Sequence, residues 1–329
     1  MTEIPIALAA NHRYLPGLLT TMASMMHFAS DRRRLVFHVF ADGLEDADKE
    51  AVLSLAAEYS CEKSVKFHHP DLEPVKKLFK PYRNSHSAFL RLFLSEYLDC
   101  DWVLYSDVDT LWARDVCGIW QKRDESVSVL WCKDCPSIAQ GVKSYSLKWN
   151  PEFDEARYSC SGVMLMNLKR MRTTGFVLKC AEFAEKWGTP WFVDQDIINA
   201  VCRNDAKIID QYWDLMMPDR RAADGAVIHC NGIGEFFNGE MKGVLPHYYI
   251  WYRFYYDVIL KDTSRKVCPI WKRAVWFLIG RVYPSRWLVK AFTWPFALHW
   301  TDNIQRAMFF SWLIGHAEWF RSWNVGKNG

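Results

Sequence analysis

Two carboxylates stand two residues apart where an apolar segment of the chain ends. Asp107 and Asp109 follow the run from Trp102 to Tyr105, whose length and composition predict a buried strand. Side chains at positions i and i+2 of a strand leave it on the same side, so both carboxylates can bind one ion while Val108 turns away. Carboxylate oxygens are hard ligands, and a divalent ion held by only two of them keeps coordination sites open for phosphate oxygens. The alternative is a solvated acidic turn, because an Asp-x-Asp pattern also arises by chance.

The segments that lead up to this pair alternate between strand and helix patterns. Strands are predicted over 4–10, 35–40, 65–68 and 102–105, and helices over 15–28, 46–59 and 87–98. Such alternation is typical of βαβ units and of a mainly parallel sheet. Ligands of these sheets bind beyond the carboxyl ends of the strands, where Asn11 and the two carboxylates would both lie.

The second half of the chain adds further polar residues at the ends of predicted elements. A turn of small residues leads into a buried strand over 158–168, in which Gly162 allows close backbone approach. A helix is predicted over 174–187. The acidic triplet 194–196 then opens an apolar run, as acidic residues at a helix N-terminus often do. A last short strand ends at His229.

Length and composition place the chain among globular proteins. Its 329 residues are 50% apolar and 24% charged, enough for one large α/β domain or for a domain with an appendage. Glu3, His12 and Arg13 interrupt the apolar stretches near the start, so no secretory leader is predicted and we expect the catalytic part in the cytosol. Ten scattered cysteines fit reduced thiols there. Cys132 and Cys135 are predicted to be structural thiols rather than a zinc or redox site.

The last part of the chain differs in composition from the rest. From Ser264 onward ten basic and two acidic residues give a net charge of +8, so the preceding residues carry −5 of the total of +3. The same segment holds eight of the seventeen tryptophans. We therefore predict two units, a catalytic domain over 1–262 and a helical segment over 263–329.

This basic, tryptophan-rich segment predicts an element that lies on a membrane surface. None of its stretches reaches the ~20 apolar residues that a spanning helix needs. Bulky aromatic and basic side chains on short helices are what an in-plane membrane element requires. A helical cap that buries its tryptophans against the catalytic domain is the alternative. Nucleic acid is not expected as a partner, because no recognised binding module accompanies the segment.

The order of the motifs resembles glycosyltransferase family 8, whose members are retaining enzymes with a GT-A, Rossmann-like fold. The resemblance covers residues 4 to about 251 and points to the bacterial lipopolysaccharide galactosyl- and glucosyltransferases. It implies an α/β mixed sheet with helices on both faces. One block alone would be a weak signal, but six in the family's order make chance agreement improbable. The blocks are Ala9-Ala10-Asn11 with Tyr14; Phe89-Leu90-Arg91-Leu92; Val103-Leu104-Tyr105-Ser106-Asp107-Val108-Asp109; Ser161-Gly162-Val163-Met164-Leu165-Met166-Asn167-Leu168; Asp194-Gln195-Asp196-Ile197-Ile198-Asn199; and His229-Cys230-Asn231-Gly232.

The resemblance implies a metal–diphosphate site. Asp107, Asp109 and His229 would hold Mn²⁺ (or Mg²⁺), and two carboxylates with one imidazole are a ligand set that suits Mn²⁺. The metal would bridge the diphosphate of a UDP-sugar and neutralise charge on the leaving group. Without the resemblance, His229 would be interpreted as an ordinary histidine at a strand end.

The resemblance also implies a set of donor-binding residues. Arg91 would pair with Asp107 or contact the sugar end of the donor, although alone it would be interpreted as part of a surface ion pair. Ala10 and Asn11 would face the uracil and ribose, and Asn11 alone fits a turn residue equally well. The full donor-binding set is Ala9, Ala10, Asn11, Tyr14, Arg91, Asp107, Val108, Cys160, Ser161 and Gly232.

Asp194 and Gln195 are the implied catalytic residues. The Asp194 carboxylate would accept hydrogen bonds from sugar hydroxyls on the acceptor side, and the Gln195 carboxamide would stabilise the oxocarbenium-like centre. The family lacks an obvious carboxylate nucleophile, so front-face attack is the implied route, with a leaving phosphate oxygen accepting the proton of the acceptor. Helix capping is the alternative for Asp194 and Asp196, but it does not explain the glutamine between them.

Two positions depart from the family pattern. Cys160 stands two residues before the glycine of the fourth block, where the family usually has asparagine. Glu235 replaces the lysine of the closing motif, and an acid there would repel a diphosphate. Either another cation replaces that lysine, with Lys242 near in sequence, or the loop that binds the donor is arranged differently. The departures concern the identity of the donor and the catalytic power, and not the fold.

Together, the residues and the resemblance predict a hexosyltransferase bound to the inner face of the cytoplasmic membrane. It would move glucose or galactose from a UDP-sugar to a glycan acceptor, such as lipopolysaccharide or lipooligosaccharide. A transferase that acts on a protein or a soluble acceptor is one alternative. A non-catalytic relative that binds a sugar nucleotide or scaffolds a membrane complex is another, and Cys160 and Glu235 are its support. The oligomeric state is left open.

Overall fold

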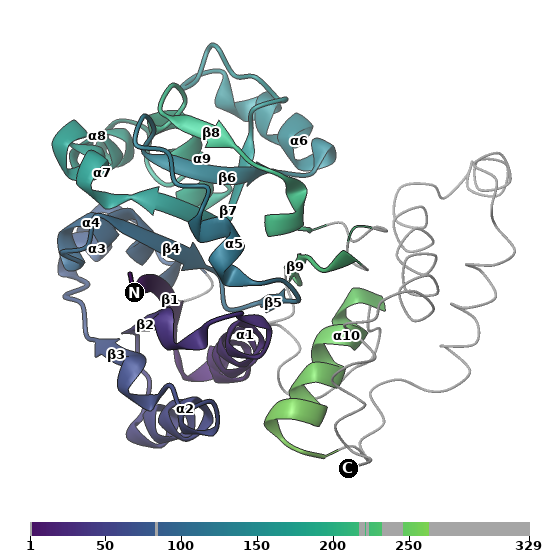
Figure 1. Cartoon of the computed structure of the whole chain (residues 1–329). Coiled ribbons are helices and arrows are strands. Elements are labelled where there is room, and N and C mark those ends of the chain that lie inside the picture. Colours follow the sequence, from purple (N-terminus) through teal and green to yellow (C-terminus); the bar gives the residue numbers. More distant parts are fainter. Residues whose placement is uncertain (1, 83–84, 217–220, 222–223, 232–245, 263–329) are drawn as a thin grey trace, which may run out of the picture.

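Two β-sheets organise the part of the chain that the structure describes (Figure 1). The computed structural model describes residues 2–82, 85–216, 221, 224–231 and 246–262. The larger sheet has seven strands, which are β1 (Ile4–Ala10), β2 (Leu35–Ala41), β3 (Val65–His68), β4 (Trp102–Ser106), β6 (Val129–Lys133), β7 (Ser159–Asn167) and β8 (Ala206–Ile208). The smaller sheet pairs β5 (Thr110–Trp112) with β9 (Val227–His229).

The larger sheet is mixed, in the order β3-β2-β1-β4-β7-β6-β8. Strands β3, β2, β1 and β4 are parallel, β7 is antiparallel to both of its neighbours, and β6 is parallel to β8. Only β7 is therefore reversed, and the predicted mainly parallel sheet is confirmed. Because β1 and β4 are parallel neighbours, Asn11 and Asp107 leave the sheet at the same edge, as the sequence predicted.

Alternate residues of the central strands β1 and β4 enter two separate hydrophobic clusters. Ile6 and Leu8 of β1 belong to the first cluster, and Ala7 between them belongs to the second. In β4, Leu104 faces the first cluster while Tyr105 faces the second. Both faces of the sheet are thus covered, which explains why its strands read as continuous apolar runs.

Helices cover both faces of the sheet (Figure 1). The first cluster receives α1 (Leu15–Phe28), α2 (Asp46–Glu58), α5 (Val116–Trp120) and α10 (Pro246–Phe254). The second receives α3 (Glu73–Leu78), α4 (Leu94–Tyr97), α7 (Leu168–Thr174), α8 (Phe176–Trp187) and α9 (Val193–Val201). Helix α6 (Pro136–Ser146) packs in a third, smaller cluster with the loop before β7. Short helical segments are η1 (His12–Tyr14), η2 (Arg32–Arg34), η3 (Glu62–Ser64), η4 (Ser87–Phe93), η5 (Gln211–Trp213) and η8 (Tyr255–Ile259).

One predicted helix has a different structure, and one short helix was not predicted. The helix predicted over 87–98 is the 3₁₀ segment η4 followed by the single turn α4. Residues 89–93 are all buried, which the one-sided pattern of a surface α-helix does not allow. The helix predicted over 174–187 is confirmed as α8, and the separate helix α7, which was not predicted, precedes it and ends at Gly175. That glycine has a φ of 66°, the left-handed conformation that ends helices.

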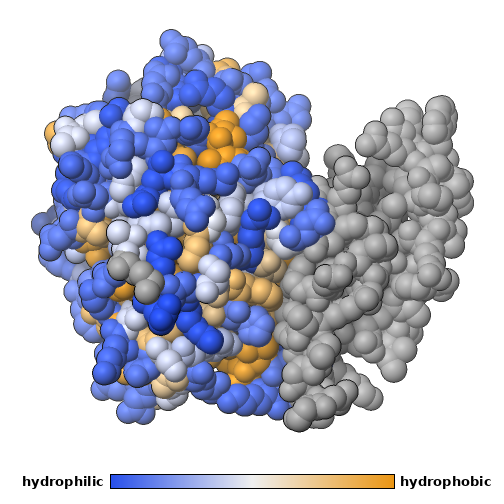
Figure 2. All heavy atoms as spheres, in the orientation of Figure 1, coloured by the Kyte–Doolittle hydropathy of each residue, from blue (hydrophilic) through white to orange (hydrophobic). Residues whose placement is uncertain are grey.

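The surface of the described part is mostly hydrophilic on the face that Figure 2 shows, and its hydrophobic residues form small separate groups. Within the described ranges no helix combines the length and apolarity needed to cross a bilayer.

Candidate active site

The structure brings the three predicted metal ligands together at the carboxyl end of β4. The Asp107 N–H donates to the Gly162 carbonyl of β7 at 2.7 Å, and the Asp109 carbonyl accepts the N–H of Cys230 at 2.8 Å. These backbone bonds fix the turn that carries both carboxylates. Ligand atoms of Asp107, Asp109 and His229 all lie within 4.8 Å of one another.

His229 reaches the carboxylates because the β5–β9 ribbon pairs it with Thr110. Its Nε2 lies 3.1 Å from Asp109 Oδ1 and 4.0 Å from Asp107 Oδ2. On the other side of the ring, Nδ1 donates to Asp214 Oδ1 at 2.9 Å. A carboxylate behind an imidazole fixes its tautomer and turns the second nitrogen toward the cation site. Asp214 is fully buried, and the sequence analysis missed it.

The donor set fits a divalent cation. Asp109 Oδ1 is buried, and its nearest charged neighbour is His229 Nε2 at 3.1 Å, so a cation would supply the partner that a buried carboxylate oxygen requires. Burial alone would lower the pKa of His229, but Asp109 and Asp214 raise that pKa well above its usual value. Asp107, Asp109 and Asp214 surround one imidazole, so the cluster has an excess of negative charge that a bound cation would neutralise.

Gly162 makes room for the imidazole. A Cβ on Gly162 would lie 2.2 Å from Cε1 and 2.7 Å from Nδ1 of His229. Asp214 binds the His229 ring on one side and Asp109 lies on the other, so the ring has little room to move away from a side chain at position 162. The close approach that the sequence predicted at Gly162 is thus an approach to the imidazole of His229.

Arg91 is buried, with 5% of its surface exposed, so the interpretation as a surface ion pair is wrong. Its Nη2 donates to Asp107 Oδ1 at 2.7 Å, its Nε lies 3.1 Å from Asp194 Oδ2, and its Nη1 donates to the Ser161 carbonyl at 2.7 Å. The guanidinium also lies 4.4 Å from the centre of the Tyr105 ring. Loss of this cation would leave the buried Asp194 carboxylate and the partly buried Asp107 carboxylate without it, a cost of about 3–5 kcal/mol.

A cavity of about 210 Å³ opens beside the metal cluster. Asn11 borders it, and the Asn11 Oδ1 also accepts the Tyr14 N–H at 3.3 Å, so this side chain serves the predicted turn as well. Ser161 contacts Arg91 without lining the cavity. Gly232, Glu235 and Lys242 lie outside the described residues. The predicted donor-binding residues that do line the cavity are Ala9, Ala10, Asn11, Tyr14, Arg91, Asp107, Val108 and Cys160.

Gln195 lines the same cavity and is held at both ends of its carboxamide. Its Oε1 accepts the Ser161 N–H at 3.1 Å, and its Nε2 donates to Asp134 Oδ2 at 2.7 Å and to the Tyr158 hydroxyl oxygen at 2.9 Å. These contacts fix the carboxamide in one orientation at the cavity wall. Asp134 was not singled out from the sequence, where it stands inside the Cys132–Cys135 motif.

Asp194 lies behind the cavity wall rather than on it. It is 3% exposed, it pairs with Arg91, and its Oδ2 accepts the Ser161 hydroxyl at 3.1 Å. Asp196 takes the capping role, because its Oδ2 accepts the Phe192 N–H at 3.0 Å just before α9. The capping alternative therefore accounts for Asp196 and leaves Asp194 to the Arg91 network.

Burial changes the protonation of two carboxyl groups beside the cavity. It raises the pKa of Asp194 to about 6, although Arg91 opposes the shift. It raises the pKa of Asp134 to about 6 as well, against the hydrogen bonds from the Cys135 N–H and Gln195. Both groups therefore titrate near neutral pH, where small changes in their surroundings alter the charge.

Most cysteines of the described part are buried. The cysteines of the described part form no disulfide, and buried Cys132 donates to the Asp210 carbonyl at 3.1 Å. Cys160 lies with its Sγ 3.8 Å from His229 Nδ1, and burial raises its pKa well above the usual value, which keeps it a neutral thiol. The segment 263–329 lies outside the described residues.

Comparisons with known proteins agree with the fold and the motif order. A family model described as Glycosyl transferase family 8 matches residues 5–233. A Haemophilus influenzae protein that is named as a glycosyltransferase is 23% identical over 219 residues, which cover 65% of this chain and 64% of that protein. Glucoside xylosyltransferase 2 of Mus musculus is 32% identical over 190 residues, which cover 53% of this chain and 39% of that protein. The match thus spans less than two thirds of either relative.

Solved structures share the fold at low sequence identity. The galactosyltransferase LgtC in complex with donor and acceptor sugar analogues has a TM-score of 0.61 at 23% identity, and the match covers 73% of this chain and 97% of that one. The bifunctional glycosyltransferase WbbM has a TM-score of 0.61 at 16% identity, with coverage of 77% and 52%. These similarities confirm the predicted GT-A-like α/β architecture.

Proposed function

The chain belongs to glycosyl transferase family 8, and from this premise we propose that it transfers a hexose from a UDP-sugar to a saccharide acceptor with retention of configuration. The observation that carries the proposal is the cluster of Asp107, Asp109 and His229 beside a cavity, with Asp214 behind the imidazole. Carboxylates next to a cavity of this size suit a ligand that brings both phosphate and a sugar ring.

Asp107, Asp109 and His229 would hold a divalent cation, Mn²⁺ or Mg²⁺. When bound, the cation would neutralise charge on the diphosphate as it leaves. Asp214 keeps the Nε2 lone pair of His229 directed at the site, and Gly162 keeps the ring in place. Arg91 donates a hydrogen bond to the Asp107 carboxylate and so holds it in position.

The uridine end of the donor would lie along Ala10, Asn11 and Tyr14. These residues form the cavity wall at the end of β1, beside the metal cluster at the end of β4. The main-chain and amide groups there can bond to a base and a ribose, while Val108 contributes an apolar surface. The mouse relatives are glucoside xylosyltransferases, so UDP-xylose belongs among the donors to be tested.

Gln195 would stabilise the positive charge that develops at the anomeric carbon. Its Oε1 and Nε2 are already bound by Ser161 and Asp134, so the carboxamide needs no reorganisation when the sugar enters. The acceptor hydroxyl would attack on the face that the diphosphate leaves, and a leaving phosphate oxygen would accept its proton. Asp194 would act through Arg91 and Ser161, because it does not line the cavity.

The acceptor is proposed to be a membrane-linked saccharide such as lipopolysaccharide or lipooligosaccharide. The support is the composition of residues 263–329, where basic residues and tryptophans suit the surface of the inner face of the cytoplasmic membrane. A soluble or protein acceptor is the alternative. A second alternative is a non-catalytic relative of the family, which would bind the sugar nucleotide in the cavity without transferring the sugar.

Calorimetry of UDP binding tests the metal–diphosphate site. Wild type should bind UDP with Mn²⁺ present and at least about tenfold more weakly after chelation, and Asp109→Asn should abolish the difference. Asp46→Asn, whose side chain is 96% exposed, is the matched control and should behave as wild type. Equal UDP binding with and without Mn²⁺ in wild type would contradict the proposed site.

A further inference from the structure

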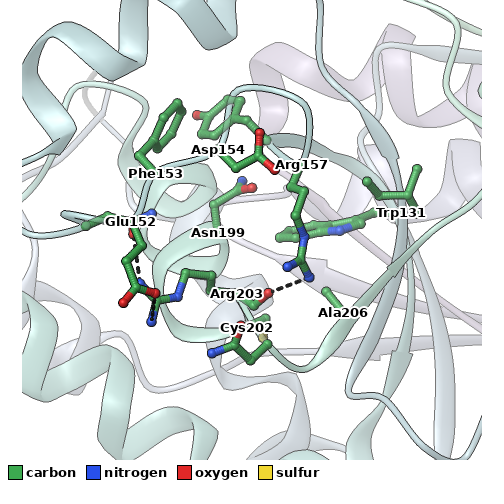
Figure 3. A pocket seen from close by; sticks show the side chains of 13 residues that line it. Trp131, Glu152, Phe153, Asp154, Arg157, Asn199, Cys202, Arg203 and Ala206 are labelled. Carbon is green, nitrogen blue, oxygen red and sulfur yellow. Dashed lines mark hydrogen bonds and ion pairs between the residues drawn. The ribbon is translucent and has the colours of Figure 1, made fainter.

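A second cavity lies at the β8 edge of the larger sheet (Figure 3). It measures about 220 Å³ and shares no lining residue with the cavity beside the metal cluster. Its walls come from β6, β8, the end of α9 and the loop that precedes β7. We refer to it as the β8-edge pocket. The two cavities are separated by Tyr158, which lines the β8-edge pocket while its hydroxyl accepts from Gln195 at 2.9 Å.

A buried amide supplies a donor to the β8-edge pocket. Asn150 is 6% exposed, and its Oδ1 accepts from Arg203 Nη1 at 3.2 Å. Asn150 lines the pocket, and the bond from Arg203 occupies its oxygen rather than its amide nitrogen. That nitrogen can therefore donate to an oxygen of a ligand in the pocket. Asn204 adds a second, exposed amide to the lining.

The β8-edge pocket also holds a cation without a carboxylate partner. Arg203 is paired with Glu152 Oε2 at 3.1 Å, but Arg157 donates only to the Arg203 carbonyl, at 2.9 Å, and forms no ion pair within the described ranges (Figure 3). Asp154 lines the pocket too, and it accepts the Ala156 N–H within its own turn. The planar guanidinium group of Arg157 can therefore bind an oxyanion.

Apart from Asn199, the other lining residues of the β8-edge pocket are mostly apolar. Trp131, Phe153 and Tyr158 border it together with Ala206 and Ile208. Phe153 and Tyr158 pack with ring centres 5.6 Å apart, and Trp131 is 2% exposed, so this wall is firmly held. An apolar wall that faces amide and guanidinium groups suits a ring that has C–H groups on one side and hydroxyls on its rim.

We propose that the β8-edge pocket binds one anionic sugar unit, a pyranose that carries a carboxylate or a phosphate group. Arg157 binds the oxyanion, Asn150 and Asn204 bind hydroxyls, and the ring packs against Phe153, which is only partly buried. A free inorganic anion would leave the amides and the apolar wall without a role. A neutral sugar would leave Arg157 without one. The assignment does not depend on transferase activity.

Ligand-observed NMR titration of the full chain tests the assignment, with glucuronate, glucose 6-phosphate, glucose and inorganic sulfate as probes. Glucuronate or glucose 6-phosphate should bind at least about tenfold more tightly than glucose and sulfate, because charge-assisted hydrogen bonds add to ring contacts. Arg157→Ala should remove that preference, and Arg157→Lys should retain part of it. Arg33→Ala is the control, since Arg33 is an exposed arginine outside the pocket lining.

Three results would overturn the assignment. Sulfate could bind as tightly as the acidic sugars, which would reduce the pocket to an anion site. Arg157→Ala could bind the acidic sugars as wild type does. UDP with Mn²⁺ could displace the bound sugar, which would show that the sugar binds in the cavity beside the metal cluster. A failure of the proposed transferase reaction would affect none of these measurements, so the two proposals can be judged separately.

Discussion

At the scale of single residues, the candidate site depends on one glycine beside one histidine. Gly162→Ala should lower Mn²⁺ affinity by about 10–100-fold, because the new methyl group would push the His229 ring away from the carboxylates. Binding can be followed by the loss of the free Mn²⁺ signal in electron paramagnetic resonance. Gly141→Ala is the control, since a Cβ there meets nothing within 4 Å. Unchanged Mn²⁺ affinity in Gly162→Ala would contradict the proposed role of His229.

Gln195 is the residue on which the proposed chemistry depends. Gln195→Ala should lower kcat by about 100-fold, since a fixed dipole beside the developing charge is lost, and should leave the donor KM within about threefold. Steady-state kinetics with the preferred donor measure both values. Gln121→Ala, at an exposed position, controls for the loss of an amide. Near wild-type turnover with intact donor binding would show that Gln195 is not catalytic.

Asp134 should make the stability of the protein depend on pH. Its pKa is raised to about 6 in the fold, so the folded chain binds more protons than the unfolded chain between about pH 4 and pH 6, and stability falls as pH rises through that window. Asp134→Asn removes the group. Its unfolding free energy relative to wild type should therefore rise by about 2–3 kcal/mol from pH 4 to pH 7 in chelator. Urea unfolding of both proteins at each pH measures this difference in unfolding free energy. A difference that stays the same from pH 4 to pH 7 would contradict the raised pKa of Asp134.

Several site residues could be predicted from the sequence because each follows a recognisable element. Asp107 and Asp109 end a buried strand, and Gln195 lies between two acids at a helix start. Asp214 carried no such signal, because its role depends on the β5–β9 ribbon that brings His229 beside it. Asp134 was similarly hidden, since its partner Gln195 is 61 residues away in sequence. Contacts between distant segments are set by tertiary packing, which local patterns do not encode.

At the scale of elements, helix α2 ends in a conformation that its sequence does not favour. Ser60 has a φ of 57°, and the N–H groups of Ser60 and Cys61 donate to the carbonyls of Ala57 and Ala56. This is the Schellman arrangement, which glycine fits best. Ser60→Gly should therefore raise the unfolding free energy by about 1 kcal/mol, as measured by urea unfolding.

The same substitution inside the helix provides the control. Ser54 is exposed within α2, and Ser54→Gly should lower stability by about 0.5 kcal/mol because glycine disfavours helix interiors. Destabilisation by Ser60→Gly would contradict the assignment of a left-handed C-terminal cap.

Most elements were predictable, and the exceptions have local causes. The strands β1, β2 and β4 have apolar runs of the predicted length, because both of their faces are covered. Segment η4 was predicted as an ordinary helix, but five consecutive buried residues favour the tighter 3₁₀ turn. The division of α7 from α8 depends on Gly175, a residue that could have been recognised as a helix end.

At the scale of the whole molecule, the basic segment 263–329 should bring the protein to anionic membranes. The full chain should bind vesicles that contain anionic lipid and should be released by salt, since each well-placed cation contributes roughly 1 kcal/mol. A chain that ends at Asp262 should bind weakly, as sedimentation with vesicles would show. Neutral vesicles are the control. Equal binding of both chains to anionic vesicles would contradict the membrane role.

The most direct test of the central claim is the release of UDP from a panel of UDP-sugars. With Mn²⁺, wild type should release UDP from one UDP-hexose faster than from the others, and a saccharide acceptor should increase the rate. Asp107→Asn and chelation should each lower release by at least about 100-fold, because the diphosphate loses the charge that stabilises its departure. If no UDP-sugar in the panel released UDP above the uncatalysed rate, with or without acceptor, the proposed transferase activity would be contradicted.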